Sequence, residues 1–417
     1  MKPRQTARVF EYDRLRVGEQ GLTLAHFETL AKYSEGTDGK FFRPGHRCIH
    51  FGGHVGVVQV ENLTIEILPK ADRHGSPDKG IWRDALLEML RTCRLLKLDS
   101  LTDAHLRLRS ASMVDLYFLA FLREVQDVVH GGLVKGYRQQ DGNLSVLKGS
   151  IDFPRHLTQN LIRRDRFYTR HTVYDRDKLH NQLLKKALTI LESTARNPHI
   201  AYEAADLGLH FEDVSDLRVT PDTFRRLTYS RNTERYRTAL QLARLIILNY
   251  SPDLRGGREH VLAILFDMPM LYEEYVYRLL KKAAQGSVTR VSRQESAVFW
   301  EGSGMRKNIR PDIVIDHQSQ RFVLDTKWKI PSDGRPSDAD LKQMYAYNLQ
   351  FGSKHSFLIY PKTGPQTKTH GTFRPMHQNF GAHSHGCHLQ YMRLFESSGK
   401  KLDKNAGAEV LRLLNEQ

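Results

Sequence analysis

Two short apolar segments near the C-terminal end of the chain limit its fold more than any other feature of the sequence. Residues 312–315 read Asp-Ile-Val-Ile, and residues 321–329 read Arg-Phe-Val-Leu-Asp-Thr-Lys-Trp-Lys. Only polar residues separate them, with a turn at residues 317–320, which predicts a strand, a turn and a second strand. Each strand carries an acid at one end of its apolar run, and pairing of the strands as a hairpin brings Asp312 near Asp325.

The second strand also carries two lysines close to its acid. Asp325, Lys327 and Lys329 share one face of the strand, because side chains alternate with a period of two. Charged side chains against a buried strand are costly unless they are used. The hairpin therefore predicts a charged functional site on an otherwise apolar sheet.

The elements predicted around the hairpin complete a sheet domain. A helix over residues 270–284 and short strands at 287–292 and 296–300 precede the hairpin; a helix over 341–349, capped by Ser337 and Asp340, and a strand over 355–360 follow it. The order helix, three or four strands, helix, strand predicts an α/β sandwich in which helices flank one sheet.

Two carboxylates beside a lysine suit the hydrolysis of a phosphodiester bond. Asp312 and Asp325 supply the oxygen ligands that Mg²⁺ prefers. A metal held there polarises the scissile phosphate and lowers the pKa of a bound water, while Lys327 positions or deprotonates that water and offsets charge in the transition state. The spacing alone arises readily by chance, and the alternative is a surface salt bridge on a hairpin. The apolar context of both acids favours the site.

The two flanking helices offer further candidates. Glu273, with Glu274 beside it, lies on the helix before the hairpin and is a candidate ligand for a metal, either directly or through water. On the helix after it, Gln343 and Tyr347 share a face at i,i+4 spacing and are candidates for contacting a phosphate or orienting the site. The alternatives are a solvated helical face for the glutamates and ordinary surface hydrogen bonding for Gln343.

Charge and cysteine content bear on the partners of the chain. The 417 residues carry a formal net charge of +16, with a pI of about 9.7, which favours a polyanionic partner such as nucleic acid over a merely basic soluble protein. The three cysteines are scattered, which predicts no disulfide framework and fits a reducing cytoplasm. No apolar run approaches the roughly 20 residues that a membrane span needs.

The rest of the chain divides by its patterning into two further regions. We expect a mixed α+β protein with a β-rich N-terminal domain over 1–110, a mainly helical region over 111–255 and the sheet domain over 256–417. The supporting patterns are a hairpin with one buried face at 50–60 and 63–68, helices at 81–98, 113–129, 179–191 and 234–248, and a strand pair that joins residues around 141–143 to 147–153.

This combination of motifs resembles the McrC family, the nuclease subunits of McrBC modification-dependent restriction systems. In the C-terminal part of the chain, the motifs that carry the resemblance are Leu271-Tyr272-Glu273, RPDIVI at 310–315, LDTKWK at 324–329 and QMYAY at 343–347. In the N-terminal and middle parts of the chain, the motifs that carry it are GVVQV at 56–60, LTIEILPK at 63–70, LKGSIDF at 147–153, Asn160, Tyr174-Asp175 and Leu179-His180-Asn181. The resemblance thus extends over most of the chain.

The resemblance implies a PD-(D/E)xK endonuclease domain. Asp312 and Asp325 are then metal ligands, Lys327 is the catalytic lysine, and Glu273 matches the helical acid of the family as a third ligand. The implied cofactor is Mg²⁺, for which Mn²⁺ is able to substitute, and the implied substrate is double-stranded DNA. Gln343 completes the set of candidate catalytic residues.

The resemblance also implies a protein partner. That partner is an McrB-like AAA+ GTPase ring that recognises methylated DNA, docks with the N-terminal region of McrC-like chains and is stimulated by them. This chain has no G-x-x-x-x-G-K-[ST] loop, because Ser398-Gly399-Lys400-Lys401 lacks the earlier glycine. We therefore expect this chain to bind no nucleotide and the motor to be another chain.

Two clusters stay open in their interpretation. A segment near the C-terminus gathers histidine and cysteine at a spacing that loosely allows zinc, although it matches no standard zinc module: His377, His383, His385, Cys387 and His388. A basic cluster in the middle region suits a DNA backbone, an acidic partner surface or plain solvent: Arg163, Arg164, Arg166 and Arg170.

Two other functions compete with that of a restriction endonuclease subunit. One is a regulatory adaptor that stimulates the AAA+ ring and whose nuclease fold is inactive; the intact set of Asp312, Asp325 and Lys327 argues against it. The other is a stand-alone PD-(D/E)xK repair nuclease without a motor, against which the large N-terminal half argues. A neighbouring gene for an AAA+ GTPase would separate the stand-alone nuclease from the other two functions.

Overall fold

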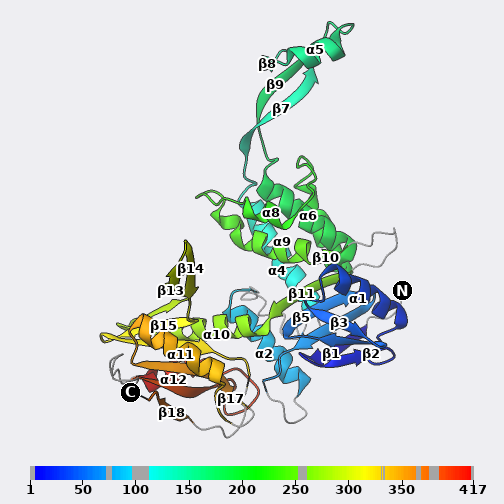
Figure 1. Cartoon of the computed structure of the whole chain (residues 1–417). Coiled ribbons are helices and arrows are strands. Elements are labelled where there is room, and N and C mark those ends of the chain that lie inside the picture. The colour runs from blue at the N-terminus through cyan, green and yellow to red at the C-terminus, as the bar shows by residue number, and fades with distance from the viewer. Residues whose placement is uncertain are drawn as a thin grey trace. The chain divides into compact units, whose positions relative to one another are not determined.

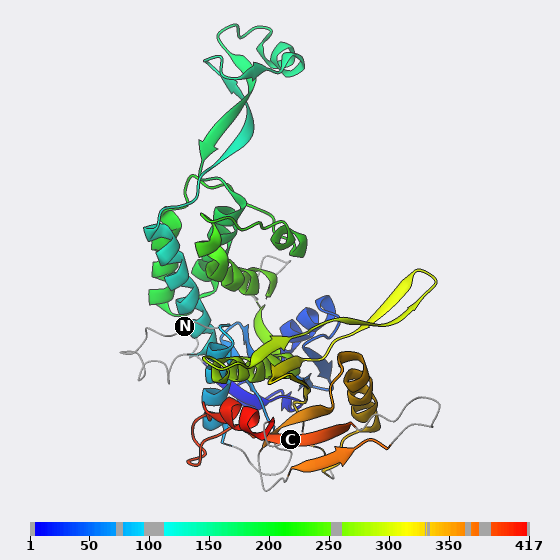
Figure 2. The ribbon, with the colours of Figure 1, turned by 90° about the vertical axis from the view of Figure 1, so that its left-hand side faces the viewer.

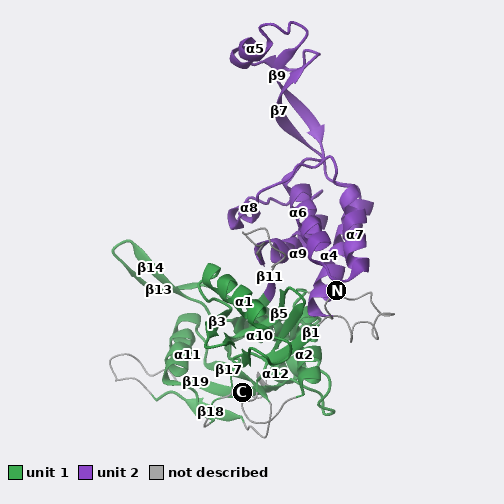
Figure 3. Ribbon diagram, turned by 90° about the vertical axis from the view of Figure 1, so that its right-hand side faces the viewer, with its two compact units in different colours: residues 1–100, 265–417 green, residues 101–264 purple. Residues whose placement is uncertain are grey.

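The chain folds into two compact units. The computed structural model describes residues 5–71, 78–95, 112–251, 261–329, 331, 334–362, 368–374 and 385–414 (Figure 1). Unit 1 comprises residues 1–100 and 265–417, and unit 2 comprises residues 101–264 (Figure 3). The two ends of the sequence therefore share one unit. The mixed α and β content that the sequence predicts is confirmed, and the predicted boundaries near 110 and 255 stay predictions.

The N-terminal part of unit 1 is built on β5 (His54–Val60) and β6 (Leu63–Leu68), which form the predicted hairpin. β1 (Gln5–Phe10) pairs with β6 in parallel. The prediction of a single buried face is wrong, because nearly all residues of both strands are buried. Two helices explain the difference: α1 (Leu24–Gly36) contacts β5, and α2 (Lys79–Thr92) contacts β6.

The segments that precede this hairpin in the sequence form a small second sheet. Its strand order is β2-β4-β3, with β2 (Arg14–Arg16), β4 (Cys48–Phe51) and β3 (Phe42–Gly45) all antiparallel. The predicted strand over 50–60 is thus interrupted at Gly52-Gly53. A Cβ at Gly53 would clash with the Tyr12 hydroxyl, so a larger residue there requires the exposed Tyr12 side chain to move.

The C-terminal part of unit 1 contains a six-stranded sheet with the order β12-β15-β16-β17-β19-β18. Its strands are β12 (Arg290–Arg293), β15 (Ile313–His317), β16 (Gln320–Thr326), β17 (His355–Lys362), β18 (Thr369–Thr372) and β19 (Gly386–Arg393). β15 and β16 form the predicted antiparallel hairpin, while β16, β17 and β19 run parallel. The predicted strand over 321–329 ends early, at Thr326.

Three helices pack on this sheet, and Figure 2 shows α11 and α12 on opposite sides of its strands. α11 (Asp338–Phe351) contacts β16 and β17, whereas α10 (Met268–Ala283) and α12 (Ala406–Leu414) contact each other. Ser337 caps α11 as predicted, since its hydroxyl accepts a hydrogen bond from the amide of Asp340. Val323 belongs to the apolar cluster under α11, so Asp325, two residues later in β16, faces α11 as well.

The predicted strand at 296–300 forms a ribbon of its own. β13 (Ala297–Gly302) pairs only with β14 (Met305–Ile309) in a two-stranded sheet that stands out from the rest of unit 1 (Figure 2).

Unit 2 combines a helical bundle with a β-ribbon. The helices are α4 (Met113–His130), α6 (Leu179–Thr194), α7 (Pro198–Leu209), α8 (Pro221–Arg225), the short 3₁₀ helix η2 (Glu234–Tyr236) and α9 (Arg237–Leu248). The ribbon consists of β7 (Gly136–Leu144), β9 (Phe167–Asp175) and the two-residue β8 (Ser150–Ile151), with α5 (Phe153–Asn160) at its end. β10 (Tyr250–Ser251) pairs with β11 (Val261–Asp267), which leads into α10.

One strand prediction in unit 2 is wrong. Residues 141–143 do not turn back toward 147–153; they lie inside β7, whose partner along its whole length is β9. In this register Asp141 forms ion pairs with Arg170 of β9 and with Arg155 of α5. No helix of the described segments is long and apolar enough to cross a membrane.

Candidate active site

The β15–β16 hairpin brings the two predicted aspartates together at one end of the sheet. Asp312 directly precedes β15, and its Oδ2 accepts hydrogen bonds from the amide of Thr326, at 2.6 Å, and from the Thr326 hydroxyl, at 2.8 Å. Asp325 is only 3% exposed. Burial raises the pKa of Asp325 to about 6, and the nearby charge of Asp312 acts in the same direction. The site therefore holds two carboxylates that repel each other.

Lys327 lies between acids from two elements. Its Nζ is 2.7 Å from Oδ2 of Asp325 and 3.2 Å from Oδ1 of Asp340 in α11. Burial alone would lower the pKa of Lys327, but Asp325 and then Asp340 outweigh it, so the pKa is raised. The backbone amide of Lys327 donates to the carbonyl of Ile359 in β17, which fixes the lysine just beyond the end of β16.

Gln343 joins α11 to this charged group. Its Oε1 lies 3.4 Å from Nζ of Lys327, and its Nε2 lies 3.4 Å from Oδ1 of Asp325 and 2.8 Å from the Tyr347 hydroxyl. Tyr347 in turn donates to the carbonyl of Arg310, just before Asp312. The predicted i,i+4 pair on α11 thus lies against the site and holds its side chains in place.

The two neighbouring glutamates of α10 have different surroundings. Glu273 accepts a hydrogen bond from Gln294 at 2.8 Å, and its pKa is raised by burial and then by the charge of Asp312. Glu274 forms ion pairs with Arg278 and Arg293 instead. The structure therefore places Glu273, rather than Glu274, within electrostatic reach of Asp312.

The residues present fit a hard divalent cation. Asp312 and Asp325 supply carboxylate oxygens on adjacent strands, and a cation between them would relieve the repulsion that raises the pKa of Asp325. Within the described residues no three acidic, histidine or cysteine side chains already form a complete metal-binding group. Two carboxylates suffice for Mg²⁺, which keeps several waters and takes further oxygens from a phosphate.

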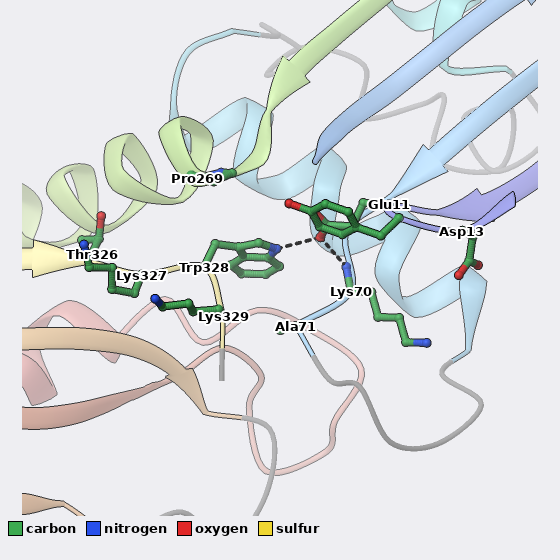
Figure 4. A pocket seen from close by; sticks show the side chains of 10 residues that line it. Glu11, Asp13, Lys70, Ala71, Pro269, Thr326, Lys327, Trp328 and Lys329 are labelled. Carbon is green, nitrogen blue, oxygen red and sulfur yellow. Dashed lines mark hydrogen bonds between the residues drawn. The ribbon is translucent and has the colours of Figure 1, made fainter. Parts of the chain in front are cut away.

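A pocket of about 680 Å³ opens beside the catalytic candidates (Figure 4). Lys327, Trp328 and Lys329 line one side of it, and Glu11 and Lys70 line another. Glu11 is buried, and its Oε1 accepts hydrogen bonds from the Trp328 indole at 2.7 Å and from the amide of Lys70 at 2.9 Å. The N-terminal and C-terminal parts of unit 1 are thus joined next to the site.

Burial raises the pKa of Glu11 to about 7. Its stabilising contribution is therefore fully present below the unfolded pKa near 4.5 and is lost as the pH rises through 7. We expect Glu11→Gln, which keeps the oxygen acceptor without the charge, to stabilise the protein relative to wild type by on the order of 2 kcal/mol more at pH 8 than at pH 5. Denaturant unfolding at both pH values measures this; a difference that does not change with pH would contradict it. Glu19→Gln, at an exposed position, serves as the control.

The sequence did not predict the contacts that Asp340, Glu11 and Trp328 make in this region. Asp340 contacts both Lys327 and Lys329, although the sequence marks it only as part of a helix cap. The contact of Glu11 with Trp328 joins residues far apart in the sequence, and no local pattern signals it.

The two open clusters are only partly described. His377 and His383 lie outside the described residues. His388 forms close ring contacts with His355 and His370, and burial lowers its pKa to about 4. Burial likewise raises the pKa of the Cys387 thiol to about 12. Cys387 and His388 are therefore neutral and packed in β19, while the buried His385 directly precedes this strand and contacts Asn348. Of the basic cluster, Arg170 is paired with Asp141, while Arg163 and Arg164 are exposed.

Comparison with known proteins identifies the class of the chain as a component of a DNA restriction system. A family model described as the McrBC 5-methylcytosine restriction system component matches residues 49–361, which is most of the chain. The chain belongs to this family, and the resemblance found in its motifs is confirmed.

Individual relatives are distant. The type IV methyl-directed restriction enzyme EcoKMcrBC of Escherichia coli K12 is 22% identical over 230 residues, which cover 52% of this chain and 64% of that relative. A chain in the half-complex of Thermococcus gammatolerans McrB AAA+ hexamers with bound McrC has 18% identity and a TM-score of 0.66, over 99% of both chains. A chain in the McrBC complex of the same organism has 17% identity and a TM-score of 0.49, over 67% of this chain and 88% of that one. The first of these two structures shows the fold.

Proposed function

We propose that this protein is the Mg²⁺-dependent DNA endonuclease subunit of an McrBC-type restriction system, with a PD-(D/E)xK active site. The observation that carries the proposal is the cluster of Asp312, Asp325 and Lys327 at the end of the β15–β16 hairpin. Family membership supports a role in restriction, and the net charge of +16 suits a DNA substrate.

In this proposal Asp312 and Asp325 hold the Mg²⁺, and Glu273 contributes through water. The bound cation supplies Lewis acidity at the scissile phosphate and a water of lowered pKa. Lys327, held by Asp325 and Asp340, directs its ammonium at the charge that develops on the phosphate oxygens. Gln343 contacts both Lys327 and Asp325 and holds their side chains in place, which limits the reorganisation needed during the reaction.

We also propose that the chain works with an AAA+ GTPase partner in the cytoplasm. The relative from Thermococcus gammatolerans is bound to McrB AAA+ hexamers. In this chain the end of the β7–β9 ribbon of unit 2 exposes large apolar side chains that a partner surface would cover: Val146, Leu147, Phe153, Leu157, Leu161 and Ile162. These residues lie outside the region 1–110 to which the sequence assigns docking, so the proposed interface includes the ribbon.

A cleavage assay with reconstituted components tests this function. Methylated and unmethylated plasmid are incubated with Mg²⁺, GTP and the full chain, with and without the AAA+ protein encoded beside it. We expect cutting only with the partner and GTP, and we expect Asp325→Ala to lose cutting while it still accelerates GTP hydrolysis. Cutting by the chain alone would favour a stand-alone nuclease. Accelerated GTP hydrolysis without cutting by wild type would favour the adaptor.

A further inference from the structure

The β13–β14 ribbon exposes apolar side chains that nothing in the proposed catalytic site uses. Val298, Phe299, Trp300 and Met305 are 42% to 59% exposed, and no other strand of the described residues pairs with the ribbon. A two-stranded hairpin is at best marginally stable in water unless a hydrophobic face is covered. The ribbon therefore presents an exposed apolar surface that is available to another molecule.

The register of the ribbon sorts its side chains into two faces. Trp300 is opposite Lys307, and Gly302 is opposite Met305, so these residues share a face. The Trp300 ring lies over Gly302, where a Cβ would come within 2.9 Å of it. On the other face Arg306 forms an ion pair with Glu301 at 2.8 Å, and the two charges neutralise each other. One face of the ribbon thus combines an aromatic ring, a thioether and a lysine.

The tip of the ribbon is narrow and well defined. Ser303 and Gly304 both have positive φ, at 50° and 78°, which is the conformation of a two-residue type I′ turn. Met305 directly follows this turn and is 59% exposed. A two-stranded ribbon with an apolar residue at its tip has the dimensions and the chemistry to enter a DNA groove and open a base step.

The base of the ribbon is tied to the candidate active site. Gln350 of α11 donates to the carbonyl of Val298 at 2.9 Å. Tyr347, which is bonded to Gln343, donates to the carbonyl of Arg310, just after β14. Arg310 itself is exposed and contacts Gln294, the partner of Glu273. A molecule that binds to the ribbon is therefore held at a fixed position relative to Asp312 and Asp325.

We propose that the β13–β14 ribbon is a DNA wedge that inserts Trp300 and Met305 between base pairs beside the scissile phosphate, while Lys307 contacts the backbone. This inference deepens the proposed function and rests on DNA being the substrate. Charge complementarity favours duplex DNA as the occupant: Lys307 on the ribbon and Arg310 at its base are exposed cations, while Arg306 and Glu301 neutralise each other. Inserted side chains unstack the base step and bend the duplex toward the site.

Equilibrium binding to duplexes that carry 2-aminopurine tests the wedge without requiring cleavage. The full chain is used in the Asp325→Ala background, with and without the AAA+ partner. We expect binding to raise 2-aminopurine fluorescence, which reports unstacking. Replacing both Trp300 and Met305 by alanine is expected to remove this rise and to weaken binding by about tenfold or more. Lys307→Ala is expected to lower the slope of the logarithm of the binding constant against the logarithm of the salt concentration by about one, which corresponds to one lost phosphate contact.

Tyr202→Ala, which alters an even more exposed ring in unit 2, is the control and is expected to change neither signal. Melting temperatures check that the ribbon variants remain folded, as expected for exposed positions. Unchanged fluorescence and affinity in the double variant would overturn the wedge. So would normal DNA binding by that variant combined with lost stimulation of GTP hydrolysis, which would make the ribbon a protein interface. Because no cutting is measured, failure of the proposed nuclease activity leaves this test intact.

Discussion

Replacing Lys327 by alanine is expected to slow DNA cleavage by about 10²- to 10³-fold, the usual cost of removing a fixed donor that stabilises transition-state charge. The structure gives the reason. The Lys327 ammonium is fixed by Asp325 at 2.7 Å and by Asp340 at 3.2 Å, and Gln343 lies 3.4 Å from it. A cation held in this way needs little reorganisation when charge develops on the phosphate.

Single-turnover cleavage of plasmid by the chain with its AAA+ partner, Mg²⁺ and GTP measures this effect. Lys354→Ala, at an exposed position ahead of β17, is the matched control and is expected to cleave at nearly the wild-type rate. Loss of Lys327 leaves Asp325 and Asp340 without their shared counter-charge, so the melting temperature of the variant is measured as well. A folded Lys327→Ala protein that cuts within tenfold of wild type would remove this residue from the mechanism.

The part of the site that the sequence predicted is the part that depends on local structure. A short polar segment between two apolar runs determines the β15–β16 hairpin, and the alternation of side chains places Asp325 and Lys327 beside each other. The capping residue Ser337 likewise acts on its own helix. Such features depend on neighbours only a few residues away, and for that reason the primary sequence contains the information.

The features that escaped prediction depend on contacts between distant segments. Glu11 is hydrogen-bonded to Trp328, although the two are 317 residues apart in the chain. The same holds for the β7–β9 pairing, which runs through residues 141–143 where the sequence predicted a turn and brings Asp141 into ion pairs with Arg155 and Arg170. Burial of both faces of β5 and β6 also comes from helices that a strand pattern does not reveal.

Changing Asp312 to asparagine is expected to remove the response of the protein to Mg²⁺ and to lower cleavage by about 10³-fold, since Lewis-acid stabilisation contributes several kcal/mol. The hydrogen bonds from the Thr326 amide and hydroxyl remain possible, because the asparagine side chain keeps an oxygen acceptor. The charge of Asp312, which adds to the raised pKa of Asp325, is lost. Without metal the variant is therefore expected to be at least as stable as wild type.

Thermal unfolding in EDTA and across a Mg²⁺ titration tests this expectation. The wild-type melting temperature is expected to rise with Mg²⁺ by mass action, and the Asp312→Asn melting temperature is expected to stay constant. Asp316→Asn, in the strand that Asp312 precedes but paired with Arg321, is the control and keeps the response. If Asp312 only anchored Thr326, asparagine would leave both the metal response and the cleavage rate unchanged. A variant that gains stability in EDTA yet loses both properties is explained by a carboxylate whose charge is required for the metal and is unfavourable without it.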